Sequence, residues 1–509
     1  MFPPSRRKNS SKPTDTPRDR IGDPLATEVL ARRSPLADLS KVDMFVILLL
    51  SAIVLAWPAI VNGSAFLYGD SASYYKGGLL AIEKIQSIVM SLFGSGDTAG
   101  LGGRVDDTLK NARGVRSAFY SLFVYITSVL SGGSAGAVLI QGAVIAWLSL
   151  LIIREAFPAL HVRWFLVVIA FLAFGTSASW MASYLMPDVF AAVTILIAAL
   201  LTLHRGNLSA LEKIALALLF CLAITFHASH LLLACGLLVI APVISRFLHD
   251  SWSQTAAILA WLGAPLLCAV VGILIVGIVG FKEVSLAPAS PPFLLARVIE
   301  DGPGYRYIKE MCPRERFAVC AFSDDLPRTA YEFLWLPEGV MTPASPEVRK
   351  QISEQEMEVV WAAVRAYPLD QAWASTRAFV YQLGHFALAP FYWGHLDFSN
   401  PRDPRPPRPP SKQHGFFIAF SVIHYVVVIA SVLVLVRVSV SQIRPLPREH
   451  VALVVFIGLG IIGNAAICGV LSGLAGRYQS RVIWLLPLLA AASVIARMSH
   501  FRWYARGTS

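Results

Sequence analysis

The sequence predicts an all-α polytopic membrane protein, with about ten transmembrane helices, an amphipathic helix on the outer surface and a small α-rich segment outside the cytoplasm. The chain has 509 residues, of which 56% are hydrophobic and only 15% are charged. Its mean hydropathy is +0.60, whereas soluble domains carry about 25% charged residues. Several apolar runs approach the length of about 20 residues that a helix needs to cross a hydrocarbon core.

The candidate spans are set by apolar length and flanking charge. Basic residues precede the first span and recur in loops on the same side of it, for example at Arg154, Arg205 and Arg246. Because Lys and Arg accumulate on the cytoplasmic side, both termini are expected in the cytoplasm. The spans are 43–61, 134–153, 164–181, 187–203, 212–226, 230–245, 255–280, 416–437, 451–471 and 481–497.

This orientation divides the chain into successive parts. They are a basic cytoplasmic tail at 1–42, which is expected to be disordered, a membrane module at 43–280 with its first outer loop at 62–133, an outer segment at 281–415, C-terminal membrane helices at 416–497 and a cytoplasmic tail at 498–509. The run VRSAFYSLFVYITSVL at 115–130 is long enough to span, but a span here would turn every later basic loop outward. We therefore interpret it as a helix lying on the outer leaflet.

The net charge of +11 is explained by the basic residues on the cytoplasmic flanks of the spans. The sequence shows no basic face interleaved with aromatic residues, which nucleic-acid binding would require. The sequence contains no Walker loop, no dinucleotide glycine fingerprint, no Ser-His-Asp order and no zinc motif. These absences argue against a nucleotide-linked substrate. The sequence assigns no cofactor with certainty and leaves a divalent cation open.

The first chemical candidate is the carboxylate of Asp70 in FLYGDSASYY, residues 66–75, which directly follows the first span on its outer side. Asp also favours turns and helix caps, so a structural role is the alternative. The neighbouring Tyr74 and Lys76 supply a hydroxyl and a cation. A carboxylate at the membrane surface can act as a general base on an acceptor hydroxyl.

Asp188 and a pair of histidines lie in two further outer turns. Asp188 follows Pro187 in SYLMPDVF, where it either caps the next helix or acts chemically. His227 and His230 in TFHASHLLL are three residues apart and can share a helix face. They can hydrogen-bond to a phosphate or to a neighbour. A metal site would need a third ligand, which Asp70 or Asp188 could supply.

Arg477, Tyr478 and Arg481 stand in GLAGRYQSRVIWLLP, residues 473–487, at the outer mouth of the last span. Arginines on the outer side run against the positive-inside trend and therefore require a partner. A guanidinium binds phosphate through a bidentate fork. The alternative is that both side chains snorkel to the outer headgroups.

Two of the six cysteines differ from the rest. Cys312 and Cys320 lie in a polar part of the outer segment, whereas the others lie in apolar runs. A disulfide between them fits if this segment faces an oxidising compartment.

The order of these motifs resembles the GT-C superfamily of membrane glycosyltransferases, in particular the bacterial branch that includes the aminoarabinose and galacturonic acid transferases of lipid A and the protein O-mannosyltransferases. The resemblance covers about 50–250 and 450–497. It rests on four motifs in order: GDSASYY after the first span, the surface helix RSAFYSLFVYITSVLSGG that begins at Arg116, MPD at an outer turn, and GRYQSRVIWLLP before the last helix.

This resemblance implies an inverting transferase in the bacterial inner membrane, with its active site facing the periplasm. The donor would be a polyprenyl-phosphate-linked sugar, and the acceptor a lipid, glycan or protein. Asp70 would be the base and Asp188 a second catalytic acid. The expected substrate-binding residues are Arg477, Tyr478, Arg481, His227, His230, Lys76, Tyr74 and Arg116.

Two other classes of function compete with this interpretation. A transporter or flippase of anionic polyprenyl-linked lipids would handle the same molecules, but transporters place ionisable groups near the bilayer midplane rather than at one surface. A non-enzymatic scaffold is supported only by the long outer segment.

Overall fold

The computed structural model describes residues 34–93, 116–288, 290–312, 314, 316–388, 396–402, 404, 414–440 and 447–507. Most of the predicted disordered tail, residues 94–115 of the first outer loop and most of the Pro-rich stretch at 400–412 lie outside the described residues.

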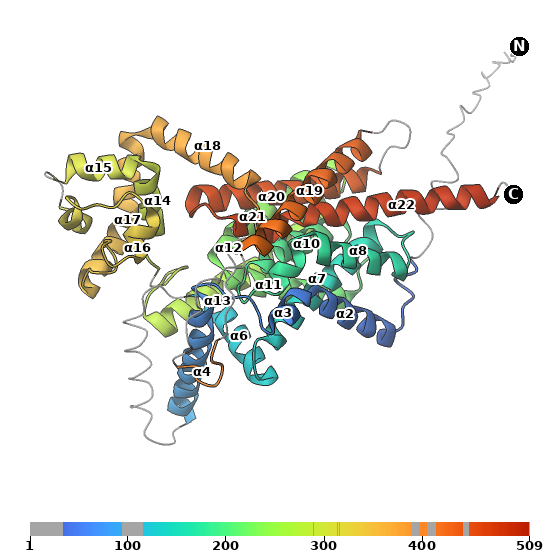
Figure 1. The fold of residues 1–509 in the computed structure, drawn as a ribbon, viewed down its shortest axis with the longest axis horizontal. Coiled ribbons are helices and arrows are strands. Elements are labelled where there is room, and N and C mark those ends of the chain that lie inside the picture. Colours follow the sequence, from blue (N-terminus) through green and yellow to red (C-terminus); the bar gives the residue numbers. More distant parts are fainter. Residues whose placement is uncertain are drawn as a thin grey trace, which may run out of the picture.

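The described residues fold into helices without a strand (Figure 1). Six helical stretches among them are long and apolar enough to cross a membrane, which confirms the prediction of an all-α membrane protein. These stretches are α7 (Ala135–Ala156), α12 (Ala228–Phe247), α13 (Trp252–Val276) continued to Phe281, α19 (His414–Ser439) from Phe417 onward, α20 (Arg448–Leu471), and α21 (Gly476–Ile483) with α22 (Leu485–Gly507) up to Met498.

The four other predicted spans are occupied by shorter helices. They are α2 (Lys41–Leu55) with α3 (Trp57–Asn62), α8 (Val162–Gly175) with α9 (Ala178–Ala182), α10 (Val189–Leu203), and α11 (Ala210–Phe226). The 15 residues of α10 extend only about 22 Å at 1.5 Å per residue. The hydrocarbon core is about 30 Å thick. The total of ten spans therefore stays a prediction.

The helix α10 lies at the centre of the bundle. All of its residues from Val189 to Thr202 are buried, and it contacts α7, α11, α12, α20 and α21. A helix that is apolar on every side is expected in such a position. Asp188, which directly precedes α10, is therefore carried into the interior of the protein.

The first outer loop contains two helices, α4 (Ser71–Phe93) and α6 (Ala118–Ser131), where the sequence analysis expected only one. α6 occupies most of the predicted surface helix, and Ser117 caps it by accepting the N–H of Tyr120. The first turns of the two helices pack tightly, because a Cβ at Gly78 would stand 2.3 Å from the carbonyl oxygen of Ser121. Only glycine permits this approach.

The outer segment forms a lobe of α14 (Phe293–Asp301), α15 (Pro303–Met311), α16 (Ala330–Trp335) and α17 (Pro346–Ala366). It has an apolar cluster of its own, which includes Leu295, Phe333 and Ile352. The structure pairs Cys312 with Cys320 in a disulfide within this lobe. α18 (Pro368–Gly384) runs from the lobe to α20 and α21 in the bundle (Figure 1).

Loops that were predicted on the cytoplasmic side contact one another in the structure. Arg154 Nη1 lies 2.6 Å from Glu212 Oε1, Arg205 donates to the carbonyl of Gln254 at 3.5 Å, and Arg497 donates to the carbonyl of Val438 at 3.2 Å. Figure 1 shows the start of α2 and the end of α22 at the end of the bundle opposite the lobe. The loops that were predicted on the cytoplasmic side therefore lie at the opposite end of the bundle from the lobe, which was predicted on the outer side.

This separation leads to a topology prediction. A periplasmic reporter such as alkaline phosphatase, fused after Gly133 or after Gly415, should be active. The same reporter fused at the C-terminus should be inactive. Activity of a cytoplasmic reporter at Gly415 would show instead that 115–130 spans the membrane and that the later orientations are inverted.

Candidate active site

Backbone pairing brings the two acid-bearing loops together. The N–H of Phe66 donates to the carbonyl of Ser183 at 2.8 Å, and the N–H of Leu185 donates to the carbonyl of Phe66 at 2.9 Å. The hydroxyl of Ser71 then donates to the carbonyl of Leu185 at 3.0 Å. The chain between the first span and α4 is therefore fastened to the turn that precedes α10, so that Asp70 and Asp188 face the same region.

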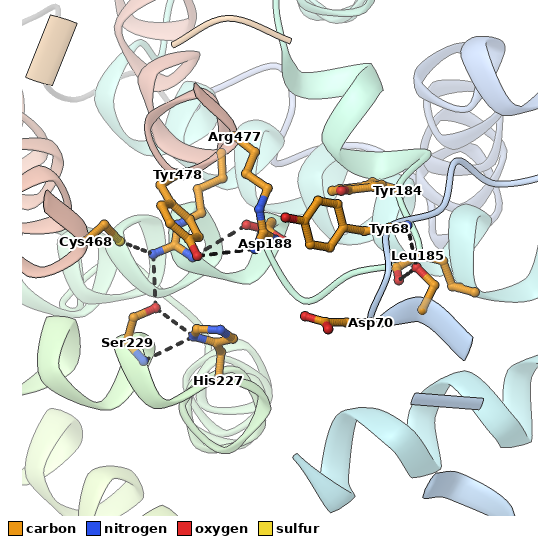
Figure 2. A network of polar contacts seen from close by, with 12 residues as sticks. Tyr68, Asp70, Tyr184, Leu185, Asp188, His227, Ser229, Cys468, Arg477 and Tyr478 are labelled. Carbon is orange, nitrogen blue, oxygen red and sulfur yellow. Dashed lines mark hydrogen bonds and ion pairs between the residues drawn. The ribbon is translucent and has the colours of Figure 1, made fainter. Parts of the chain in front are cut away.

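Asp188 is paired with two arginines from α21, and Figure 2 shows one of them, Arg477, beside it. Its Oδ2 lies 3.1 Å from Arg477 Nη1, and its Oδ1 lies 3.6 Å from Arg481 Nη1. Asp188 is 2% exposed, Arg477 8% and Arg481 1%. Although Asp188 occupies the N-cap position of α10, its side chain makes no cap hydrogen bond. Its role is therefore that of an ion-pair partner and not of a cap.

The short helix α21 presents both arginines because they are four residues apart and share one face. Its start is held tightly: Gln382 of α18 accepts the N–H of Ala475 at 3.0 Å and donates to the Ala475 carbonyl at 2.9 Å. A Cβ at Gly476 would stand 2.6 Å from the carbonyl of Ala387. The arginines are thus directed inward, and the alternative that they snorkel to headgroups is not what the structure shows.

Arg481 uses all three of its guanidinium nitrogens within the protein. Nε and Nη2 donate to Asn464 Oδ1 at 3.1 and 2.8 Å, and Nη2 also reaches Ser229 Oγ at 3.0 Å and Cys468 Sγ at 3.0 Å. Arg477 is held differently, because its guanidinium lies over the rings of Tyr68 at 4.3 Å and Tyr478 at 4.7 Å. Its Nε is buried without a hydrogen bond.

The two histidines carry their ring proton on different nitrogens. His230 Nδ1 lies 2.8 Å from the carbonyl of Ala223, so this nitrogen carries the proton and Nε2 does not. His227 Nδ1 accepts the N–H of Ser229 at 3.2 Å, so its proton is on Nε2. Burial and the neighbouring Arg481 lower the pKa of His227 to about 3. A neutral imidazole with a donor at Nε2 therefore stands beside the arginines.

Asp70 is the more accessible of the two acids. Its Oδ1 accepts a hydrogen bond from Arg116 Nη2, and its side chain is 22% exposed. The guanidinium of Arg116 also lies 5.9 Å from the ring centroid of Trp335 in the outer segment. Figure 2 shows the carboxylate of Asp70 pointing toward the side of the cluster on which His227 lies.

Tyr74 connects the two acids. Burial, reinforced by the charge of Asp70, raises the pKa of Tyr74 above its ordinary value, and Asp188 acts in the same direction. Arg116 and Arg477 oppose that shift. Tyr74 therefore remains a protonated hydrogen-bond donor.

The structure assembles most of the residues that the sequence indicated. Asp70, Tyr74, Arg116, Asp188, His227, His230, Arg477, Tyr478 and Arg481 gather at one end of the bundle. Lys76 is exposed on α4 and joins none of the contacts above. Among the residues that the structure describes, no three His, Cys, Asp or Glu side chains converge as metal ligands. Asp188 faces arginines instead.

Other members of the site were not anticipated. Asn464 anchors Arg481 and also donates to the carbonyl of Tyr478 at 2.7 Å, and Tyr68 covers Arg477. The sequence could have indicated Asn464, the single amide in the apolar run IIGNAAIC, because a polar side chain within a span is costly unless it has a partner. Nothing in the sequence around Trp335 indicated its contact with Arg116.

No protein-family model, curated protein or solved structure matches this chain at a significant level.

The buried cluster leads to a stability prediction. Asp188→Asn should leave two buried guanidiniums without a counter-charge, a change that typically costs about 3–5 kcal/mol. The thermal unfolding midpoint of the purified protein should fall clearly. Asp70→Asn is the control, because a partly exposed ion pair contributes about 1 kcal/mol or less. Equal midpoints for the two variants would contradict the assignment of Asp188 as the central counter-ion.

Proposed function

We propose that this protein is an integral membrane glycosyltransferase. It moves a sugar from a polyprenyl-phosphate donor to a lipid, glycan or protein acceptor on the outer face of the membrane. We place it in a bacterial inner membrane with the site facing the periplasm. The resemblance of its motifs to GT-C enzymes suggests the reaction, and the charge of the site supports it.

The supporting observation is the charge imbalance around Asp188. Two guanidiniums face one carboxylate there, and His227 is neutral because its pKa is lowered to about 3. The neighbouring Asp70 and Arg116 neutralise each other. The site therefore holds one excess positive charge, which favours an anionic group such as a phosphate.

The two arginines take different parts in this proposal. Arg481 is fully engaged by Asn464 and its other neighbours and is 1% exposed, so it has no free donor for a ligand. Arg477 pairs with Asp188 through Nη1 at 3.1 Å and donates to the Tyr478 hydroxyl through Nη2 at 3.3 Å. Its Nε has no hydrogen bond. We assign the donor phosphate to Arg477, with the Nε2–H of His227 as a second donor.

Asp70 acts on the acceptor. Its Oδ2 makes no hydrogen bond to other described residues, while Oδ1 is oriented by Arg116. Oδ2 takes the proton of an acceptor hydroxyl as that oxygen attacks the anomeric carbon of the donor. The bond from this carbon to the phosphate oxygen breaks, the electron pair leaves with the polyprenyl phosphate, and Arg477 stabilises the charge that develops. Direct displacement inverts the anomeric carbon.

The broad test is a comparison of lipid and envelope-glycan extracts from a deletion strain and its parent by mass spectrometry. The proposal predicts that one glycosyl unit is missing from an acceptor and that the polyprenyl-phosphate sugar accumulates. If the protein were a transporter of the same lipids, its deletion would instead leave the donor on the cytoplasmic leaflet. Transport would also not require Asp70 as a base. Unchanged extracts would refute the proposed transfer.

The specific prediction concerns Asp70→Asn, which keeps the size and polarity of the side chain but removes the proton acceptor. Restoration of the missing glycosyl unit in the deletion strain should fall by about 10²–10⁴ in rate, the contribution typical of a general base. Binding of the donor lipid should persist.

Glu83→Gln is the matched control. Glu83 lies on α4 and pairs with Arg402 at 2.6 Å, so this change also removes an ion-paired acid but not the proposed base. Glu83→Gln should transfer at the wild-type rate. An Asp70→Asn variant that also transfers at that rate would remove Asp70 from the mechanism.

A further inference from the structure

The outer segment contains a cavity that the transfer chemistry does not use. It has a volume of about 540 Å³ and lies between α15, the start of α18 and the chain near Arg328. Ligand pockets commonly fall between about 300 and 1,000 Å³. The cavity is therefore large enough for a small molecule or for a few units of a polymer.

The lining of this cavity is rich in cations. Arg306, Lys309, Arg328 and Arg377 contribute to it, together with the acids Asp301, Glu310 and Asp370. Two of these acids are already occupied, Asp370 by Arg306 at 3.1 Å and Asp301 by the buried Arg297 at 2.8 Å. Arg297 does not line the cavity and is also paired with Glu300 at 3.2 Å, so the positive charge of the cavity comes from its own lining cations.

Three of the lining cations have no ion-pair partner among the described residues. Lys309 donates only to the backbone carbonyl of Asp324 at 2.9 Å, Arg328 lies 4.3 Å from the ring centroid of Tyr305, and Arg377 is exposed. Unpaired guanidinium and ammonium groups around a concave surface favour an anionic ligand, and guanidinium in particular suits planar carboxylates.

The cavity also offers an aromatic surface. Trp373 is 69% exposed and lines the cavity beside Arg377. An indole ring can pack against the C–H face of a sugar while its N–H meets water or a hydroxyl. The third acid, Glu310, accepts the hydroxyl of Tyr367 through Oε2, and its other oxygen can accept a hydrogen bond from a sugar hydroxyl. This mixture of cations, acids and an open aromatic ring suits a charged saccharide better than an acyl chain, which would require an apolar wall.

We propose that this cavity binds a saccharide that carries carboxylate groups and thereby holds the acceptor of the transfer reaction. This inference deepens the proposed function, on which its reference to an acceptor rests. The binding step itself is independent of catalysis and is measured without turnover.

The position of the cavity fits an acceptor that reaches the site. α18 lines the cavity with Trp373 and Arg377, and its Gln382 holds Ala475 at the start of the arginine-bearing α21. Trp373 and Gln382 lie about 14 Å apart along the helix axis at 1.5 Å per residue. One helix therefore connects the wall of the cavity to the residue that holds the start of α21.

The test is calorimetric titration of the purified full-length protein with trigalacturonate, with maltotriose as the neutral ligand of equal length and with inorganic phosphate. We expect trigalacturonate to bind and maltotriose and phosphate to bind at least tenfold more weakly. Arg377→Gln should weaken trigalacturonate binding about 10–100-fold, the loss of one charge-assisted hydrogen bond. Trp373→Ala should also weaken it.

Two variants of the same outer segment serve as matched controls. Arg365→Gln removes an exposed arginine of α17, and Trp361→Ala removes a 54% exposed tryptophan of α17, neither of which lines the cavity. Both should bind trigalacturonate as the wild type does. No binding of trigalacturonate, equal binding of maltotriose, or equal losses in the control variants would overturn the proposal.

The outcome is separable from that of the proposed transfer. If Asp70→Asn binds trigalacturonate normally but fails to transfer, both proposals are supported. If trigalacturonate does not bind while Asp70→Asn abolishes transfer, only the cavity proposal fails.

Discussion

The burial of Asp188 between Arg477 and Arg481 fixes how the loops and helices of the site meet. A carboxylate and two guanidiniums taken out of water cost several kcal/mol each unless their partners are well placed. Asn464, Ser229 and Cys468 place Arg481, and the rings of Tyr68 and Tyr478 place Arg477. These contacts draw the first outer loop, α10, α12, α20 and α21 into one junction.

An apolar core of similar volume would hold the same helices together at lower cost. The cluster is therefore better understood as a preorganised anion site than as a device for stability. In the proposed reaction, the excess positive charge is in place before the donor binds, so that little reorganisation is needed when charge develops on the leaving phosphate. In the proposed reaction, the partly exposed pair of Asp70 and Arg116 supplies the accessible base.

Much of the candidate site could be predicted from the sequence because membrane topology sorts residues onto two sides. Asp70, Asp188, His227 and Arg477 were each assigned to the outer side from apolar length and basic loops, and the structure brings them together. The pairing of Asp188 with both arginines could not be predicted, since it depends on how α10 and α21 cross. Helix α4 was missed because Gly77 and Gly78 suggest a loop, whereas they permit close packing on α6. The outer cavity was missed because its lining comes from positions as far apart as Asp301 and Arg377.

The central claim is that the Asp188 cluster binds the phosphate of a polyprenyl lipid. The most direct measurement is native mass spectrometry of the purified wild-type protein with undecaprenyl phosphate and with undecaprenol, which has the same chain but no charge. The account predicts that undecaprenyl phosphate binds at least tenfold more tightly and that Arg477→Ala removes this preference. Equal binding of the two lipids to the wild-type protein would contradict it.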